Sequence, residues 1–249
     1  MAPKLLDEHQ VAEREAAILE ATTEVINQVG VAGLTVDKVV AKVPYSKGTV
    51  YNHFSCKEDL LVALCNECVS HLCELFEKAV TFEGPSRERM LAVAYAYLLS
   101  VQLRPERYLL VITAKGPAVK EKASEQRQAT HKALEARLMG IFCGVITHAI
   151  EQRELTQPQG LTPPEIAFSV WAMAFGTIAL LVEENAGAAI CSIRQQMVLE
   201  HQVMQNTNLV LDGLGWQPST SNEALQGLIA RFKSELFAEE SEFLAAQSQ

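Results

Sequence analysis

Apolar residues recur every three or four positions along most of the chain, which is the spacing of amphipathic α-helices. In residues 8–29, for example, Val11, Ile18, Val25 and Val29 fall on one side of a helix. No stretch shows the strict alternation of apolar and polar residues that is typical of a β-strand. The pattern therefore predicts an all-α fold of about ten helices.

Glycine, proline and capping residues divide this pattern into separate predicted helices. Residues 36–43 and 47–54 form two short helices after the first one, and residues 57–81 form a longer helix. The later predicted helices cover residues 86–103, 105–114, 119–154, 163–185, 190–213 and 220–246.

Residues that can accept hydrogen bonds from free backbone N–H groups stand at several of these predicted helix starts. Thr35 and Ser46 precede the two short helices. The spacing of a capping box recurs at Ser55 with Glu58, Thr162 with Glu165, and Thr220 with Glu223.

The two short helices have the size and separation of a helix-turn-helix. In the second of them, Val50 and Phe54 are four residues apart and predict a buried anchor. This leaves polar side chains to face outward or to flank the anchor, as a helix in a DNA major groove requires. These side chains are Lys47, Thr49, Tyr51, Asn52 and His53.

The charge of the chain is distributed unevenly. The 249 residues carry a net charge of −9, which argues against a nonspecific binder of polyanions. Residues 1–57 hold six basic and seven acidic residues, a net charge of −1. The stretch from Lys38 to Lys57 nevertheless contains four lysines and no acid, so a small basic segment lies within an acidic protein.

Other features limit the location and chemistry of the protein. The polar start predicts no signal peptide, and six cysteines without one indicate free thiols in the cytoplasm. Residues 166–182 are uncharged, but we expect a helix buried in a core or a subunit interface, not a membrane span. Cys65 and Cys68 share an apolar helical stripe, which predicts core packing without a metal. Because no catalytic motif is present, we expect no enzyme.

The segment LTVDKVVAKVPYSKGTVYNHFSCKEDLL, residues 34–61, resembles the DNA-binding signature of the TetR family of bacterial transcriptional regulators. The specific part comprises Ser46, Thr49-Val50-Tyr51, His53-Phe54, Lys57 and Leu60-Leu61. With the preceding helix, the resemblance covers about residues 8–65. It implies a three-helix DNA-binding domain at residues 1–56 and a larger helical domain for effector binding and dimerisation at residues 57–249. Residues 57–81 would link the two, and residues 220–246 would add an extra helix.

The resemblance also implies roles for single residues. Thr49 and Tyr51 would bind phosphates, as would Lys57, while Lys47 would donate to a guanine edge. Asn52 is a second candidate for reading bases, and His53 would either contact the DNA backbone or pack inward. The full set of expected DNA-binding residues is Thr35, Lys38, Ser46, Lys47, Thr49, Tyr51, Asn52, His53 and Lys57.

Two residues depart from the family pattern. Pro44 occupies a turn position where glycine is usual, and proline cannot adopt a positive φ, so the turn must differ locally. Asp37 stands near a position where arginine is common and would repel phosphate. Together with the charge of −1, these departures predict weak nonspecific DNA binding.

The function that we expect is that of a sequence-specific repressor, a homodimer on a palindromic operator that responds to a small molecule. The helices at 163–185 and 190–213 would form the dimer interface. The effector would be hydrophobic or aromatic, with no cofactor. Residues that could line its site are Tyr95, Tyr108, His131, Phe142, His148, Trp171 and Phe175.

Two other hypotheses about the function stay open at this point. One is a helical dimeric protein-interaction module with weakened or lost DNA binding, which Pro44 and the charge balance favour. The other is a helical enzyme with an incidental helix-turn-helix, for which the sequence offers no catalytic cluster.

Overall fold

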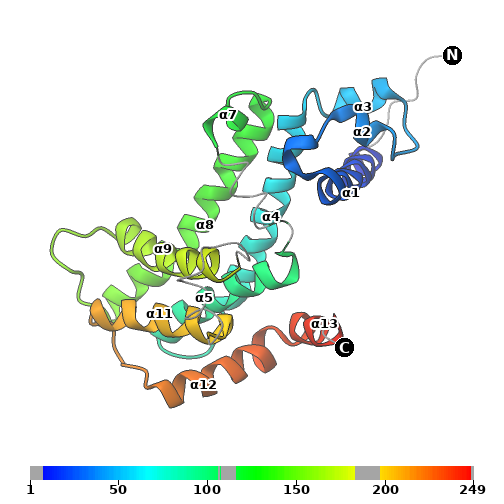
Figure 1. Ribbon diagram of the computed structural model, residues 1–249. Coiled ribbons are helices and arrows are strands. Elements are labelled where there is room, and N and C mark those ends of the chain that lie inside the picture. The colour runs from blue at the N-terminus through cyan, green and yellow to red at the C-terminus, as the bar shows by residue number, and fades with distance from the viewer. Residues whose placement is uncertain (1–7, 106, 108–115, 183–196, 248–249) are drawn as a thin grey trace. The chain divides into compact units, whose positions relative to one another are not determined.

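The computed structural model describes residues 8–105, 107, 116–182 and 197–247. In these residues the regular structure is helical throughout (Figure 1), which confirms the all-α prediction. The chain forms two compact units. The first contains residues 1–70 and 105–134, and the second contains residues 71–104 and 135–249.

The first unit is built on the N-terminal helices α1 (Glu8–Gly33), α2 (Val36–Val40) and α3 (Lys47–His53). The start of α4 (Lys57–Ala79), the short α7 (Pro117–Lys120) and the first third of α8 (Glu125–Glu151) complete it. The apolar stripes predicted from spacing meet in its core. The core side chains with at most 2% exposure include Ile18, Val25, Leu34, Val39, Val50, Phe54, Leu60 and Leu64.

The second unit is organised around α5 (Ser86–Leu103), which is buried on almost every side. Helix α11 (Leu199–Gly213) packs on both α5 and α9 (Pro163–Val182), as Figure 1 shows. The Arg87 side chain on α5 is fully buried and donates to Asn208 Oδ1 at 2.8 Å on α11. It also forms an ion pair with Asp212. These contacts fasten the end of α11 to the start of α5.

The C-terminal segment departs from the prediction of one helix over residues 220–246. It consists of α12 (Asn222–Arg231), a π-helical turn (Phe232–Leu236) and α13 (Ala238–Gln247). In the π-turn the Phe237 N–H donates to Phe232 O at 2.9 Å, five residues back. This wider turn lets both phenyl rings contact Tyr95, with centroid distances of 5.9 and 5.8 Å. A regular helix would turn the two rings far apart.

Three other predictions about helices need correction. Residues 119–154 do not form one helix, because residues 121–124 separate α7 from α8. The cap before α12 is Ser221, which accepts from Ala224 N, and not Thr220. Residues 197 and 198 are not helical, so α11 begins at Leu199 and not at 190. The predicted helical residues 106, 108–114, 183–185 and 190–196 lie outside the described part of the chain.

Candidate DNA-binding site

The turn that connects α2 and α3 contains no residue with a positive φ angle. Positive φ values within the described part of the chain occur at Gly30, Arg153, Gly160 and Gly215, none of which lies in this turn. Pro44 is therefore accommodated by a turn of ordinary backbone conformation, so the turn does not need the glycine that is usual in similar sequences.

Both short helices begin at the predicted caps. The Thr35 hydroxyl accepts a hydrogen bond from Lys38 N at 3.3 Å, and the Ser46 hydroxyl accepts one from Thr49 N at 3.2 Å. The hydroxyls of Ser46 and Thr49 also lie within hydrogen-bond distance of each other, 2.9 Å apart. The Thr49 hydroxyl thus has an internal partner beside the exposed face of α3.

Helix α3 has one buried and one exposed side. Val50 and Phe54 have no exposed surface and anchor it in the first unit. Lys47, Tyr51 and Asn52 are exposed on the same short helix. A capped helix with an apolar back and a polar front can present hydrogen-bonding side chains to a DNA groove without losing its position.

Two lysines beside this face, Lys38 and Lys47, have internal partners. Lys47 Nζ lies 2.7 Å from Asp37 Oδ1, and the Tyr51 hydroxyl donates to the same oxygen at 3.4 Å. Lys38 Nζ donates to the backbone oxygen of Gly33 at 2.8 Å. The hydrogen bond with Lys47 lowers the pKa of Asp37 and raises the pKa of Lys47, so both groups are charged at neutral pH.

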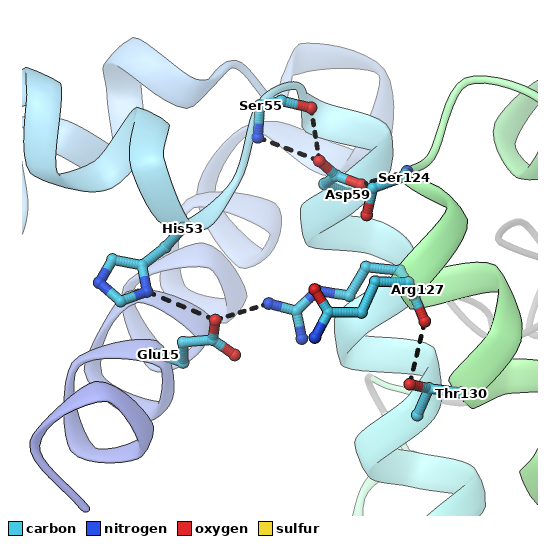
Figure 2. A network of polar contacts seen from close by, with 8 residues as sticks. Glu15, His53, Ser55, Asp59, Ser124, Arg127 and Thr130 are labelled. Carbon is cyan, nitrogen blue, oxygen red and sulfur yellow. Dashed lines mark hydrogen bonds and ion pairs between the residues drawn. The ribbon is translucent and has the colours of Figure 1, made fainter. Parts of the chain in front are cut away.

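The His53 side chain points toward α1, away from the direction expected of a DNA contact. Its Nδ1 lies 3.4 Å from Glu15 Oε1, and only 11% of the side chain is exposed. The same Glu15 oxygen accepts from Arg127 Nη2 on α8 at 2.7 Å, as Figure 2 shows. The Arg127 guanidinium also lies over the Phe54 ring, 4.9 Å from its centroid. Arg127 therefore contacts both α1 and the end of α3.

Asp59 at the start of α4 holds the next junction. Its carboxylate accepts from Ser55 N at 3.0 Å, from the Ser55 hydroxyl at 2.5 Å and from Ser124 N at 2.7 Å (Figure 2). Burial raises the pKa of Asp59, but the hydrogen bonds from Ser124 and Ser55 outweigh burial, so its pKa lies below the ordinary value. The sequence predicted Glu58 as the partner of Ser55, and this was wrong.

Similarity to known proteins agrees with this geometry. Residues 18–64, which contain α2, α3 and most of α1, match the family described as "Bacterial regulatory proteins, tetR family". Residues 18–64 therefore resemble the DNA-binding part of TetR-family regulators. The proteins of that family are transcriptional regulators that bind DNA and are not enzymes, in agreement with the expectation from the sequence.

Individual known proteins resemble the chain over more than half of its length. It is 26% identical to the "Fatty acid metabolism regulator protein" of Bacillus subtilis over 140 residues, which is 56% of this chain and 70% of that protein. The regulator FadR of B. subtilis, solved in complex with stearoyl-CoA, has a TM-score of 0.55 and 18% identity. That similarity covers 80% of this chain and 96% of FadR. A structure from Rhodococcus sp. RHA1 has a TM-score of 0.63 and 19% identity over 86% and 99% of the two chains.

The residues predicted to bind an effector are divided between the two units of the chain. His131 belongs to the first unit, where it is buried and its Nδ1 lies 2.9 Å from Asn66 Oδ1. Asn66 Nδ2 in turn donates to the backbone oxygen of Arg127 at 3.1 Å. This places His131 among the contacts that hold the start of α8.

The other predicted effector residues lie in the second unit, apart from Tyr108, which is outside the described residues. Phe142 packs edge-on against Phe76 with a centroid distance of 5.2 Å. Trp171 and Phe175 form a pair on α9 at 5.3 Å, and His148 is partly exposed near the end of α8. Tyr95 lies against the C-terminal aromatic rings, and burial raises its pKa. An effector role for these residues stays a prediction.

Sequence reasoning missed Glu15, Asp59, Ser124 and Arg127 as parts of the site. Asp59 had a local signal, because it lies four residues after Ser55 and could have been considered beside Glu58. Arg127 had none, since it lies 73 positions beyond Phe54 and only the fold brings the two together. The structure also shows Cys65 buried, in line with core packing, whereas Cys68 is only partly buried.

Proposed function

We propose that the protein is a ligand-responsive repressor that binds a palindromic operator as a homodimer, with residues 1–56 as its DNA-binding part. The observation that carries this proposal is the two-sided helix α3. Val50 and Phe54 are fully buried behind a face that exposes Lys47, Tyr51 and Asn52. Such a helix reads only a few base pairs, and two copies on a palindrome reach the affinity that a specific site needs.

Exposed apolar side chains on α9 support the homodimer. Phe168 and Leu180 are 58% and 57% exposed in the single chain, and Leu209 on the adjacent α11 is 66% exposed. Helices α8 and α9 are also long and apolar enough to cross a membrane, but length and composition alone are weak evidence for a membrane span, because core helices pass the same test. A second copy of α9 and α11 would cover the exposed side chains of Phe168, Leu180 and Leu209 in a four-helix bundle. We expect the protein to act in the cytoplasm.

We infer that the effector is a long-chain fatty acyl thioester. The support comes from the similarity to a regulator of fatty acid metabolism and to FadR, whose structure contains stearoyl-CoA. It agrees with the hydrophobic effector expected from the sequence. An effector reduces operator affinity only by its differential binding to two states of the protein, typically ~1–3 kcal/mol.

Helix α8 offers a physical link for this response. It carries Arg127 in the first unit and Phe142 and His148 in the second. A shift of this helix on effector binding would withdraw Arg127 from Glu15 and from Phe54, and it would change the orientation of α3.

The test is selection of bound duplexes from a random DNA pool, followed by affinity measurements on the selected duplex with and without stearoyl-CoA. We expect a palindromic motif, a stoichiometry of two chains for each palindrome, and a loss of affinity of about 5- to 150-fold when the acyl thioester is added. Phe168→Glu, which places a charge in the proposed interface, should give monomers with weak binding.

The rival reading is a dimeric interaction module with lost DNA binding, which the acidic charge balance and Asp37 favour. Selection without enrichment at low salt, with or without stearoyl-CoA, would contradict the repressor and support this rival. An enriched motif without palindromic symmetry would contradict the homodimer.

A further inference from the structure

The lysines of the helix-turn-helix do not extend freely toward solvent. Lys38 Nζ donates to Gly33 O, Lys42 Nζ lies 2.9 Å from Glu24 Oε2, and Lys47 Nζ lies 2.7 Å from Asp37 Oδ1. Each of these three lysines therefore has an internal acceptor. A phosphate must displace that acceptor or bind in its presence.

Asp37 differs from the other acceptors because it engages two groups on the exposed face of α3. Lys47 is 2.7 Å away and the Tyr51 hydroxyl is 3.4 Å away from the same Oδ1 atom. Lys47 Nζ also lies 5.4 Å from the centroid of the Tyr51 ring. The carboxylate, the ammonium group and the phenol form one cluster, which we call the Asp37 cluster.

The backbone fixes the position of this cluster. Val36 and Val39 are buried and anchor α2, while Val50 anchors α3. Asp37 stands in the first turn of α2, where a negative charge is favourable. The side chains of Asp37 and Lys47 are both 62% exposed. They contact each other because the packing of the two capped helices α2 and α3 places them side by side.

The geometry of an ammonium group decides what the cluster does on DNA. A lysine has three N–H donors, so Lys47 can keep one on Asp37 and offer others to the O6 and N7 acceptors of a guanine. Binding of Lys47 to a phosphate, by contrast, brings the Asp37 carboxylate against the DNA backbone. Asp37 therefore weakens the complexes in which Lys47 binds a DNA phosphate more than the complexes in which Lys47 binds a guanine base.

We propose that Asp37 is a specificity-determining residue, which holds Lys47 and Tyr51 on the face of α3 and lowers nonspecific relative to operator affinity. This inference rests on the proposed function, because it needs an operator. It differs from simple charge repulsion, which would weaken binding to every duplex equally.

The test compares the wild type with Asp37→Asn on the selected operator and on a scrambled duplex over a series of salt concentrations. Affinity for the scrambled duplex should rise about 3- to 10-fold, with a salt slope steeper by about one unit, while operator affinity changes less. Glu235→Gln, which breaks an exposed pair with Arg231 in the second unit, is the control and should change neither affinity.

A double-mutant cycle isolates the contact with Lys47. In the Lys47→Met background, Asp37→Asn should lose most of its effect on the specificity ratio. Asp37→Ser, which keeps a favourable residue in the first turn, should behave as Asp37→Asn does, and thermal melting confirms that each variant folds.

Two results would overturn the inference while leaving the repressor proposal intact. One is an equal change on both duplexes, and the other is an undiminished effect in the Lys47→Met background. If the wild type selects no operator, the proposed function and this inference both fail.

Discussion

Two groups of ionic contacts lie on either side of α3, and they differ mainly in their exposure to water. In front, Asp37 and Lys47 form a pair whose side chains are both 62% exposed. Behind, Glu15 and Arg127 form a pair with 26% and 21% exposure, and Asp59 is 3% exposed. Exposed pairs exchange partners at little cost, whereas buried polar groups are costly to leave without one. The same chemistry thus gives exchangeable contacts on the DNA side and fixed contacts behind the helix.

The largest effect is expected at Asp59. Asp59→Ala leaves the N–H groups of Ser55 and Ser124 without their acceptor, and we expect a loss of about 2–3 kcal/mol in unfolding free energy. Chemical denaturation of the whole chain measures this loss. The control is the neighbour Glu58, which forms a long ion pair with Lys122 at 4.0 Å. Glu58→Ala should cost less than about 1 kcal/mol, the value of a weak ion pair. Equal losses at both positions would contradict the difference between the two groups of contacts.

The pH dependence of stability should reveal the same carboxylate. Because the pKa of Asp59 is lowered in the folded state, its contribution is present above the unfolded pKa of about 4 and is lost as the pH falls through the folded pKa. Unfolding free energy measured from pH 7 down to about 3 should therefore fall less steeply for Asp59→Ala than for the wild type. Parallel curves would show that Asp59 is not stabilised as a carboxylate.

A smaller effect is expected at Arg127. Arg127→Met removes the ion pair with Glu15 and the stacking on Phe54, which should cost about 1–2 kcal/mol in unfolding free energy. Operator affinity should also fall about 3- to 10-fold, because the end of α3 loses a support. The matched control is Arg137→Met on the same helix, whose pair with Glu77 is exposed. The prediction is wrong if operator affinity is unchanged in the folded Arg127 variant.

The smallest effect on stability is expected in front of α3. Lys47→Met and Asp37→Asn should each change the unfolding free energy by less than about 0.5 kcal/mol, because their pair is screened by water. Thermal melting at low and high salt checks this value. A larger loss would mean that the exposed cluster holds the fold, and the contrast with the buried contacts would disappear.

The sequence correctly predicted the features that depend on residues close together in the chain, namely helix caps and buried helix faces. The caps at Thr35 and Ser46 and the buried pair Val50 and Phe54 follow from spacings of three and four residues, and the structure has them as predicted. Asp59 was missed because two acids compete for Ser55, and the choice depends on Ser124, which lies 65 positions beyond Asp59. The break before α8 has the same origin, since Asp59 accepts from Ser124 N at that point.

The C-terminal segment shows a second limit of sequence reasoning. Helical spacing continued through Phe232 and Phe237, so the pattern predicted one helix. Their packing on Tyr95 instead requires a wider turn, which depends on a residue more than 130 positions earlier. The direction of His53 was likewise set by Glu15 on another helix and not by its neighbours on α3.

The most direct test of the central claim, that the exposed face of α3 binds DNA, is the affinity of Tyr51→Ala for the selected operator. The Tyr51 side chain is exposed, and so are Asp37 and Lys47, which it contacts, so we expect an unchanged melting temperature and a loss of operator affinity of about tenfold or more. Arg231→Ala, which removes a charge in the second unit, should leave the affinity unchanged. A Tyr51→Ala variant that binds the operator as tightly as the wild type would contradict DNA binding by the exposed face of α3.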